Sequence, residues 1–93
     1  MFGVHIHRWD SLFGVWDHEA SFRTIWRAQA AAKALALPTT YTQNLYRVTD
    51  TRGGAWLTWF YYDGEEIRLA DLIGQQDEFE ITREALRLEG DAA

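Results

Sequence analysis

The pattern of apolar positions is most distinctive over the segment Ala55 to Tyr62, whose sequence AWLTWFYY predicts a β-strand that is apolar on both faces. Side chains of a strand alternate between its two faces with a period of two. A strand with one face in water would therefore alternate apolar with polar residues, which this segment does not. We expect one face to be covered by the chain's own helices and the other, at least in part, by another molecule. The first face carries Trp56, Thr58, Phe60 and Tyr62, and the second carries Ala55, Leu57, Trp59 and Tyr61.

The flanking residues predict an antiparallel meander around this strand. A strand is expected over residues 44–51, followed by a turn at Arg52-Gly53-Gly54. The dipeptide Asp63-Gly64 is the strongest hairpin signal in the chain, so residues 65–69 should fold back as a further strand. Residues 44–69 are thus expected to form three antiparallel strands with the aromatic one in the middle.

The first third of the chain predicts a strand, a turn and a helix. Phe2 to Trp9 alternates as a strand does, Asp10-Ser11 is a turn signal, and residues 12–16 are a candidate returning strand. Residues 28–37 are rich in helix formers, and Pro38 ends the run. We predict one helix from about Glu19 to Leu37, although the pattern of residues 19–27 is also compatible with a strand.

The last third predicts a short helical turn over residues 70–74 and a helix over residues 78–88, with a strand as the alternative around residues 79–81. Residues 90–93 are expected to be a disordered tail. The fold class predicted for the 93 residues is a single α+β domain. It has an antiparallel sheet of three to five strands, one long helix packed on a face and a short C-terminal helix.

The charge is unevenly distributed along the chain, whose net charge is −5. Residues 1–62 carry six basic and four acidic groups, whereas residues 63–93 carry ten acidic groups and three arginines. The acidic part argues against nucleic acid as the main partner, because phosphate binding needs clustered cations. The chain has no Cys, no signal peptide and no apolar run of membrane-spanning length, so we expect a cytoplasmic protein without membrane association.

The candidates for chemistry are few, and we expect neither an enzyme nor a cofactor. His5 and His7 would share one face of a strand, and Asp10 could add a carboxylate to a metal site, but no further ligand pair follows at suitable spacing. Ser11 and Ser21 lie in no nucleophile elbow. We therefore predict no metal site and no catalytic residue.

Two short features of the chain resemble known kinds of protein. The runs His7-Arg-Trp9 and Arg27-Ala-Gln-Ala-Ala-Ala-Lys33 resemble small zinc-ribbon-like proteins that carry H-x-W and then C-x-x-C-G-K. Alanines stand where that family has its cysteines, at Ala28 and Ala31, so the resemblance implies a lost metal site. Arginine outnumbers lysine eight to one, and small, acidic, arginine-rich chains of this type resemble phage-encoded inhibitors of host proteins.

The function predicted from the sequence is non-catalytic binding to another protein, either a host protein or a second copy in a homo-oligomer. Aromatic anchors surrounded by a polar rim are the usual centre of such an interface. One alternative is single-stranded nucleic-acid binding through arginines interleaved with rings, and another is a metal site at His5-x-His7. The arginines of the first alternative are Arg8, Arg23, Arg27, Arg47 and Arg52, and the rings are Trp9, Trp26, Tyr46 and Trp56. The predicted binding residues are the anchors Trp56, Trp59, Tyr61 and Tyr62 and the acidic rim Asp63, Glu65 and Glu66.

Overall fold

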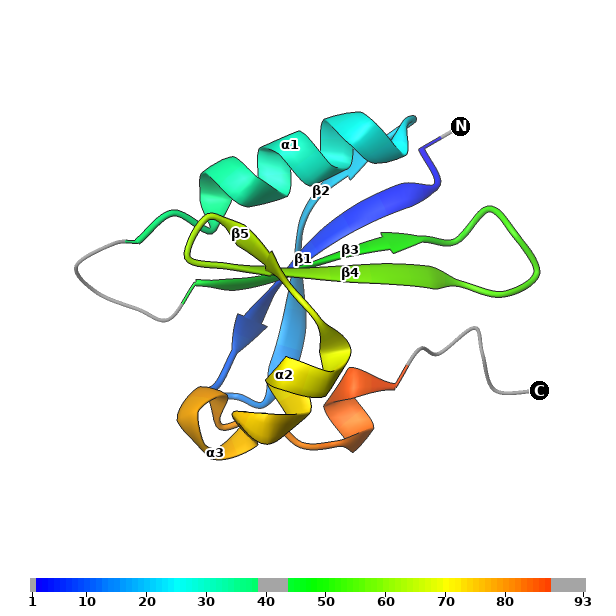
Figure 1. Ribbon diagram of the computed structural model, residues 1–93. Coiled ribbons are helices and arrows are strands. Elements are labelled where there is room, and N and C mark those ends of the chain that lie inside the picture. Colours follow the sequence, from blue (N-terminus) through cyan, green and yellow to red (C-terminus); the bar gives the residue numbers. More distant parts are fainter. Residues whose placement is uncertain (1, 39–43, 88–93) are drawn as a thin grey trace.

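The computed structural model describes residues 2–38 and 44–87 and shows the predicted α+β fold, a five-stranded antiparallel sheet with one long helix and three short ones (Figure 1). The strand order is β2-β1-β3-β4-β5. The predicted connection at residues 39–43 and the predicted tail at 90–93 lie outside the described residues. The elements are β1 (Val4–Asp10), β2 (Val15–Phe22), α1 (Ile25–Leu35), β3 (Leu45–Asp50), β4 (Leu57–Tyr62), β5 (Glu65–Ile67), α2 (Leu69–Gly74), α3 (Gln76–Phe79) and the 3-10 helix η1 (Glu84–Leu86).

Helix α1 covers one face of the sheet, which we call the helix face (Figure 1). Its contact side is made of alanines, and Ala28 and Ala32 are fully buried there. Small side chains let the helix axis approach the strands closely, so that the branched residues Val4 and Val48 and the ring of Tyr61 fill the layer between them.

The predicted meander is confirmed, with β4 between β3 and β5, but its last strand is shorter than the predicted residues 65–69 because helix α2 begins at Leu69. Its second turn is the one that the Asp63-Gly64 dipeptide predicts, since both residues have positive φ, at 58° and 81°. The Gly64 amide donates a 3.0 Å hydrogen bond to the carbonyl of Ala36 just after α1, so this hairpin is tied to the end of the helix.

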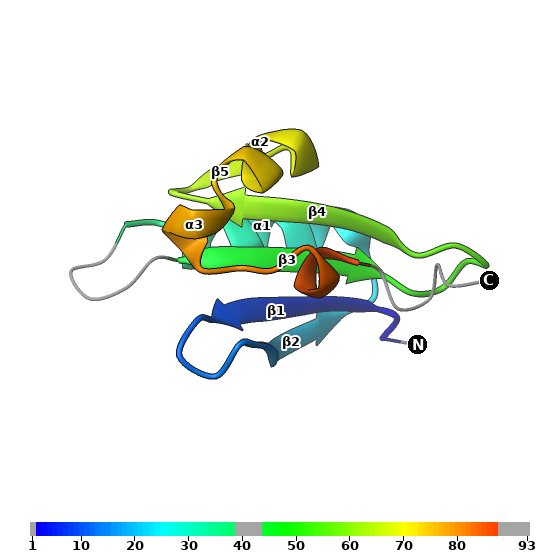
Figure 2. The ribbon, with the colours of Figure 1, turned by 90° about the horizontal axis from the view of Figure 1, so that it is seen from below.

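The opposite face of the sheet, which we call the open face, is covered by the described residues at one end only. The C-terminal segment formed by α2, α3 and η1 lies across it (Figure 2). Phe60 and Tyr62 of the aromatic strand are covered there by residues of that segment, so the chain itself supplies part of the second cover. The buried residues of this second core are Trp9, Leu45, Phe60, Leu72, Phe79, Ile81 and Leu86.

The helix predicted from Glu19 to Leu37 is shorter than expected, because residues 15–22 form strand β2. This strand pairs antiparallel with β1 along its whole length, with Val4 opposite Phe22 and Asp10 opposite Val15. Its backbone hydrogen bonds and cross-strand contacts outweigh the local helical pattern of residues 19–22, as tertiary pairing commonly does. The returning strand is therefore longer than the predicted residues 12–16.

The helix predicted over residues 78–88 is also wrong. Helix α3 ends at Phe79, and Glu80 adopts the left-handed conformation with φ 53°, which reverses the chain. Ile81 then enters the second core, and only the single 3-10 turn Glu84–Leu86 follows within the described residues. A continuous helix would place Phe79 and Leu86 on one side but Ile81 on the opposite side, so it could not bring all three into one core.

Two tryptophans of the first hairpin hold the C-terminal segment on the sheet. The indole Nε1–H of Trp9 donates a 2.9 Å hydrogen bond to the carbonyl oxygen of Phe79, and that of Trp16 donates a 2.7 Å bond to Ala85. The two rings pack together, with centroids 5.2 Å apart. The segment is thus attached through polar bonds as well as through apolar contact.

We expect Trp9→Phe to lower the free energy of unfolding by roughly 1–3 kcal/mol, because the carbonyl of Phe79 loses its donor within a buried region. Urea unfolding followed by circular dichroism measures this. The control is Trp26→Phe, since the Trp26 side chain is 65% exposed and its replacement should change stability by less than about 0.5 kcal/mol. Equal stability of the two variants would contradict the role given to the Trp9 indole.

Candidate functional site

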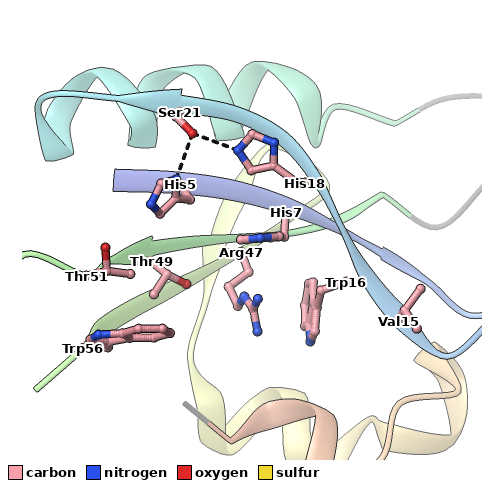
Figure 3. Close-up of a pocket in the computed structure, with 10 residues that line it drawn as sticks. All are labelled: His5, His7, Val15, Trp16, His18, Ser21, Arg47, Thr49, Thr51 and Trp56. Carbon is pink, nitrogen blue, oxygen red and sulfur yellow. Dashed lines mark hydrogen bonds between the residues drawn. The ribbon is translucent and has the colours of Figure 1, made fainter. Parts of the chain in front are cut away.

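The uncovered end of the open face holds a groove of about 760 Å³ (Figure 3). Strands β1, β2 and β3 and the start of the aromatic segment supply its walls and floor. The residues that line the groove are His5, His7, Val15, Trp16, His18, Ser21, Arg47, Thr49, Thr51 and Trp56. They combine three imidazoles, a guanidinium, hydroxyls and two indole rings on one surface.

A β-bulge in β2 decides which side chains enter the groove. Ser21 lies opposite His5 and Ala20 opposite Ile6, but the next pair is His18 opposite His7, so Glu19 is left out of the register. An extra residue of this kind shifts the alternation of a strand. His18 therefore points to the same face as Ser21, where regular alternation would have placed Glu19.

The three imidazoles gather around one hydroxyl group. Ser21 Oγ lies 2.8 Å from Nδ1 of His5 and 2.8 Å from Nε2 of His18, as the dashed lines in Figure 3 mark. The ring of His7 is 5.5 Å from that of His18 and 6.5 Å from that of His5, measured between centroids. Ser21 thus fixes two of the rings, and the third lies beside them.

His7 is neutral at pH 7. Burial of its ring, together with the charges of Arg47 and of the neighbouring imidazoles, lowers the pKa of His7 from 6.5 to about 4. A neutral imidazole can offer one N–H donor and one acceptor nitrogen to a ligand, but it adds no positive charge to the groove.

Arg47 is the cationic residue among those that line the groove. Its guanidinium lies over the ring of Trp16, 4.5 Å from the centroid, a cation–π distance. Trp16 itself is held by its bond to Ala85 and by contacts with Trp9 and Phe60. These contacts fix the position of the Trp16 ring over which the guanidinium of Arg47 lies.

Several buried polar atoms of the open face have no hydrogen-bond partner within the described part of the chain. They are Nδ1 of His7 and the hydroxyl oxygens of Thr49 and Thr58, which are opposite each other on β3 and β4. Thr49 is only 3% exposed. His7 and Thr49 line the groove. Buried polar groups are nearly always paired, so two such atoms at one groove favour a ligand or bound water there.

The residues predicted as a binding surface do not form one surface. Tyr61 is 1% exposed and belongs to the core under α1, whereas Tyr62 packs edge-on against Phe79 with centroids 4.8 Å apart. Trp59 packs against the core of the helix face, and Trp56 lines the groove on the other side of the sheet. The predicted rim residues Asp63, Glu65 and Glu66 are exposed around the β4–β5 hairpin.

The metal candidates from the sequence are only partly brought together. His5 and His7 do share the open face, but Asp10 accepts hydrogen bonds from the amides of Leu12 and Phe13 in the hairpin turn. Within residues 2–38 and 44–87, no three histidine or carboxylate side chains are arranged to hold a metal ion.

The arginines considered for nucleic-acid binding do not form a track. Only Arg47 lines the groove. The guanidinium of Arg52 is paired with Asp50, at 2.8 Å and 3.0 Å, and its NH1 also donates to the carbonyl of Arg23. The others lie apart: Arg8 is 3.5 Å from Glu19, Arg23 is over Phe2, and Arg27 is over Trp26.

The Ser21–imidazole contacts have the distance of a nucleophile and a base, but the usual third member is missing among the residues that line the groove. None of those residues is a carboxylate that could orient an imidazole, as catalytic triads require. The arrangement is suited to binding through hydrogen bonds and ring contacts.

No protein-family model, no curated protein and no solved structure matches this chain. Among the helices of the described ranges, none is both long and apolar enough to cross a membrane.

We expect the stability of the protein to rise with pH between about 4 and 6.5 through His7. The unfolded state binds the proton of this imidazole over that range and the folded state does not, so folding becomes more favourable as pH increases. In His7→Gln, the loss of unfolding free energy between pH 7 and pH 5 should be smaller than in the parent by on the order of 1–2 kcal/mol. Urea unfolding at both pH values measures it, and an unchanged loss would contradict the burial of a neutral His7.

Proposed function

We propose that this protein is a non-catalytic binding protein whose ligand occupies the groove on the open face. The observation that supports this most directly is the combination of a concave, uncovered sheet surface with buried polar atoms at its floor, Nδ1 of His7 and Oγ1 of Thr49. Binding sites for small ligands are concave surfaces with apolar walls and a few placed polar groups, and this groove has both.

The walls of the groove offer ring surfaces to a ligand, and its floor offers hydrogen-bonding groups. Trp16 is held by its bond to Ala85, so it is a rigid wall. Trp56 lies just before β4 and is partly exposed, so its ring is available to a ligand. The hydroxyls and imidazoles of the floor can form directional hydrogen bonds. A ligand that supplies partners for these groups offsets the free-energy cost of keeping them away from water.

We expect small-molecule ligands from a fragment library to shift the amide and indole NMR signals of Trp16, Thr49 and Trp56. Trp56→Ala should weaken the binding of these ligands about tenfold, because a buried aromatic contact is worth more than 1 kcal/mol. Trp26→Ala is the matched control, since that ring is exposed on α1 and should leave affinity unchanged. A library whose ligands all bind elsewhere, or none of which binds, would contradict the groove as a ligand site.

A specific observation also supports the protein association predicted from the sequence, although at another place. The turn between β1 and β2 exposes two large apolar side chains, Leu12 at 82% and Phe13 at 74%, next to the exposed Val15. Adjacent exposed apolar residues at a hairpin tip are typical of contact surfaces. As the second candidate function, we propose protein association through this tip. The simplest partner is a second copy of the chain, and a host protein is the partner that fits the phage-inhibitor type of role inferred from the composition.

For this second candidate we expect light scattering to give a mass that rises above the 10.8 kDa of one chain as concentration increases. The double variant Leu12→Ser/Phe13→Ser should remain at the mass of one chain, because it removes the apolar surface that a second copy would bury. Trp26→Ser is the control for loss of an exposed ring elsewhere. A parent protein that keeps the mass of one chain at every concentration would rule out self-association through the tip.

A further inference from the structure

We infer that the ligand of the groove is a small molecule that joins a flat ring to an oxyanion, either a phosphate or a carboxylate. This inference rests on the proposed function and specifies the chemical class of the ligand. It follows from three features of the groove: the sign of its charge, the donors on its floor, and the position of its rings.

The charge of the groove is opposite to that of the chain. The protein has 14 acidic residues and a net charge of −5, yet none of the ten described residues that line the groove is acidic. Arg47 is among them, together with three histidines. In a protein with so many carboxylates, a concave site whose described lining has none of them is complementary to a negatively charged ligand.

The polar groups of the floor match the oxygens of such an anion. A guanidinium presents a planar fork of N–H donors that fits two oxygens of a phosphate or carboxylate, and the contact with the ring of Trp16, at 4.5 Å, helps to hold the guanidinium of Arg47 in place. The hydroxyl of Thr49, more than nine-tenths buried and without a hydrogen-bond partner among the described residues, adds a donor beside it on β3. His7 adds a neutral imidazole whose Nδ1 is likewise unpaired within the described chain.

The rings of the groove match a flat group. In the view of Figure 3, Trp56 lies on the other side of Arg47 from Trp16. One face of Trp16 is already occupied by the guanidinium, at 4.5 Å, so Trp56 is the ring left for stacking. A ligand ring on Trp56 would then carry its oxyanion towards Arg47 and Thr49.

The size and charge of the site favour a small molecule over a nucleic-acid strand or an acidic polypeptide. A strand needs a row of cations along its phosphates. Among the described residues, one arginine lines the groove, and Arg8, Arg52 and Arg23 lie elsewhere, the first two beside carboxylates and the third over Phe2. One guanidinium beside one available ring is suited to one oxyanion on one ring system.

The test is titration of the full chain with matched ligands, followed by NMR. The phosphate arm compares the four nucleoside 5′-monophosphates with their uncharged nucleosides and with inorganic phosphate. The carboxylate arm compares benzoate and indole-3-carboxylate with benzamide and indole-3-carboxamide. In at least one arm, we expect the ring-bearing anion to bind about tenfold more tightly than its neutral counterpart, as expected for a charge-assisted contact, and the preferred arm identifies the anion.

Two variants assign the contacts. Arg47→Gln should remove the preference for the anion over its neutral counterpart, and Trp56→Ala should weaken both by a similar factor. Arg27→Gln is the matched control, because Arg27 lies over the exposed ring of Trp26 away from the groove. The comparison of ligands on the parent protein needs no variant, so the inference can be tested even where a substitution disturbs folding.

Three results would overturn the inference. The first is neutral ligands that bind as tightly as their anions in both arms, and the second is inorganic phosphate that binds as tightly as the monophosphates. The third is a poly-glutamate peptide or an oligothymidylate that binds more tightly than every small anion. If neutral fragments still bind in the groove while all ring-bearing anions fail, this inference falls and the proposed function remains. If nothing binds in the groove, both fall.

Discussion

The structure depends on two hydrogen bonds from indole rings to the chain that returns across the sheet. Trp9 and Trp16, from the first hairpin, donate to the carbonyls of Phe79 and Ala85, about seventy residues later in the sequence. These bonds fix where the C-terminal segment lies, and hence where it ends. Its apolar side chains cover one end of the open face, and the groove begins where that cover stops. The position of the groove is therefore decided by a contact at its edge. Of the four residues that make this contact, Trp16 also lines the groove.

The open face changes character along its length, and this change follows from the strands themselves. At the covered end, β1 and β3 present Trp9 and Leu45, which need shielding from water. Towards the other end, the same two strands present His5 and Thr49, which do not. A short chain has little surface to spare for covering a sheet twice, and here the cover is placed where the apolar residues are. The described residues leave the remaining polar surface open at little cost in folding free energy.

The sequence was informative where structure is local and less so where it depends on distant contacts. The meander and its Asp63-Gly64 turn follow from signals a few residues apart, and they are confirmed. Residues 19–22 form a strand because they pair with β1. Residues 78–86 do not form one continuous helix, because their apolar side chains pack in the second core. The groove was missed for a related reason. Regular alternation puts His18 and Ser21 on opposite faces, and only the bulge at Glu19 brings them together. The sequence predicts Arg47 as part of a nucleic-acid-binding surface and Trp56 as part of a protein interface, and neither prediction places the two residues in one groove.

The Ser21 hydroxyl, which touches two imidazoles, couples the tautomers of those rings. The oxygen carries one proton, which it can give either to Nδ1 of His5 or to Nε2 of His18, each 2.8 Å away. The ring that does not receive it satisfies the contact by donating its own N–H to the oxygen. While the hydroxyl donates to one of two neutral rings, only two arrangements exist, and they differ at both histidines at once. A change of tautomer at one ring then requires the hydroxyl to turn and the other ring to change too. As long as the hydroxyl donates to one ring and accepts from the other, the far nitrogens, Nε2 of His5 and Nδ1 of His18, exchange donor and acceptor roles together.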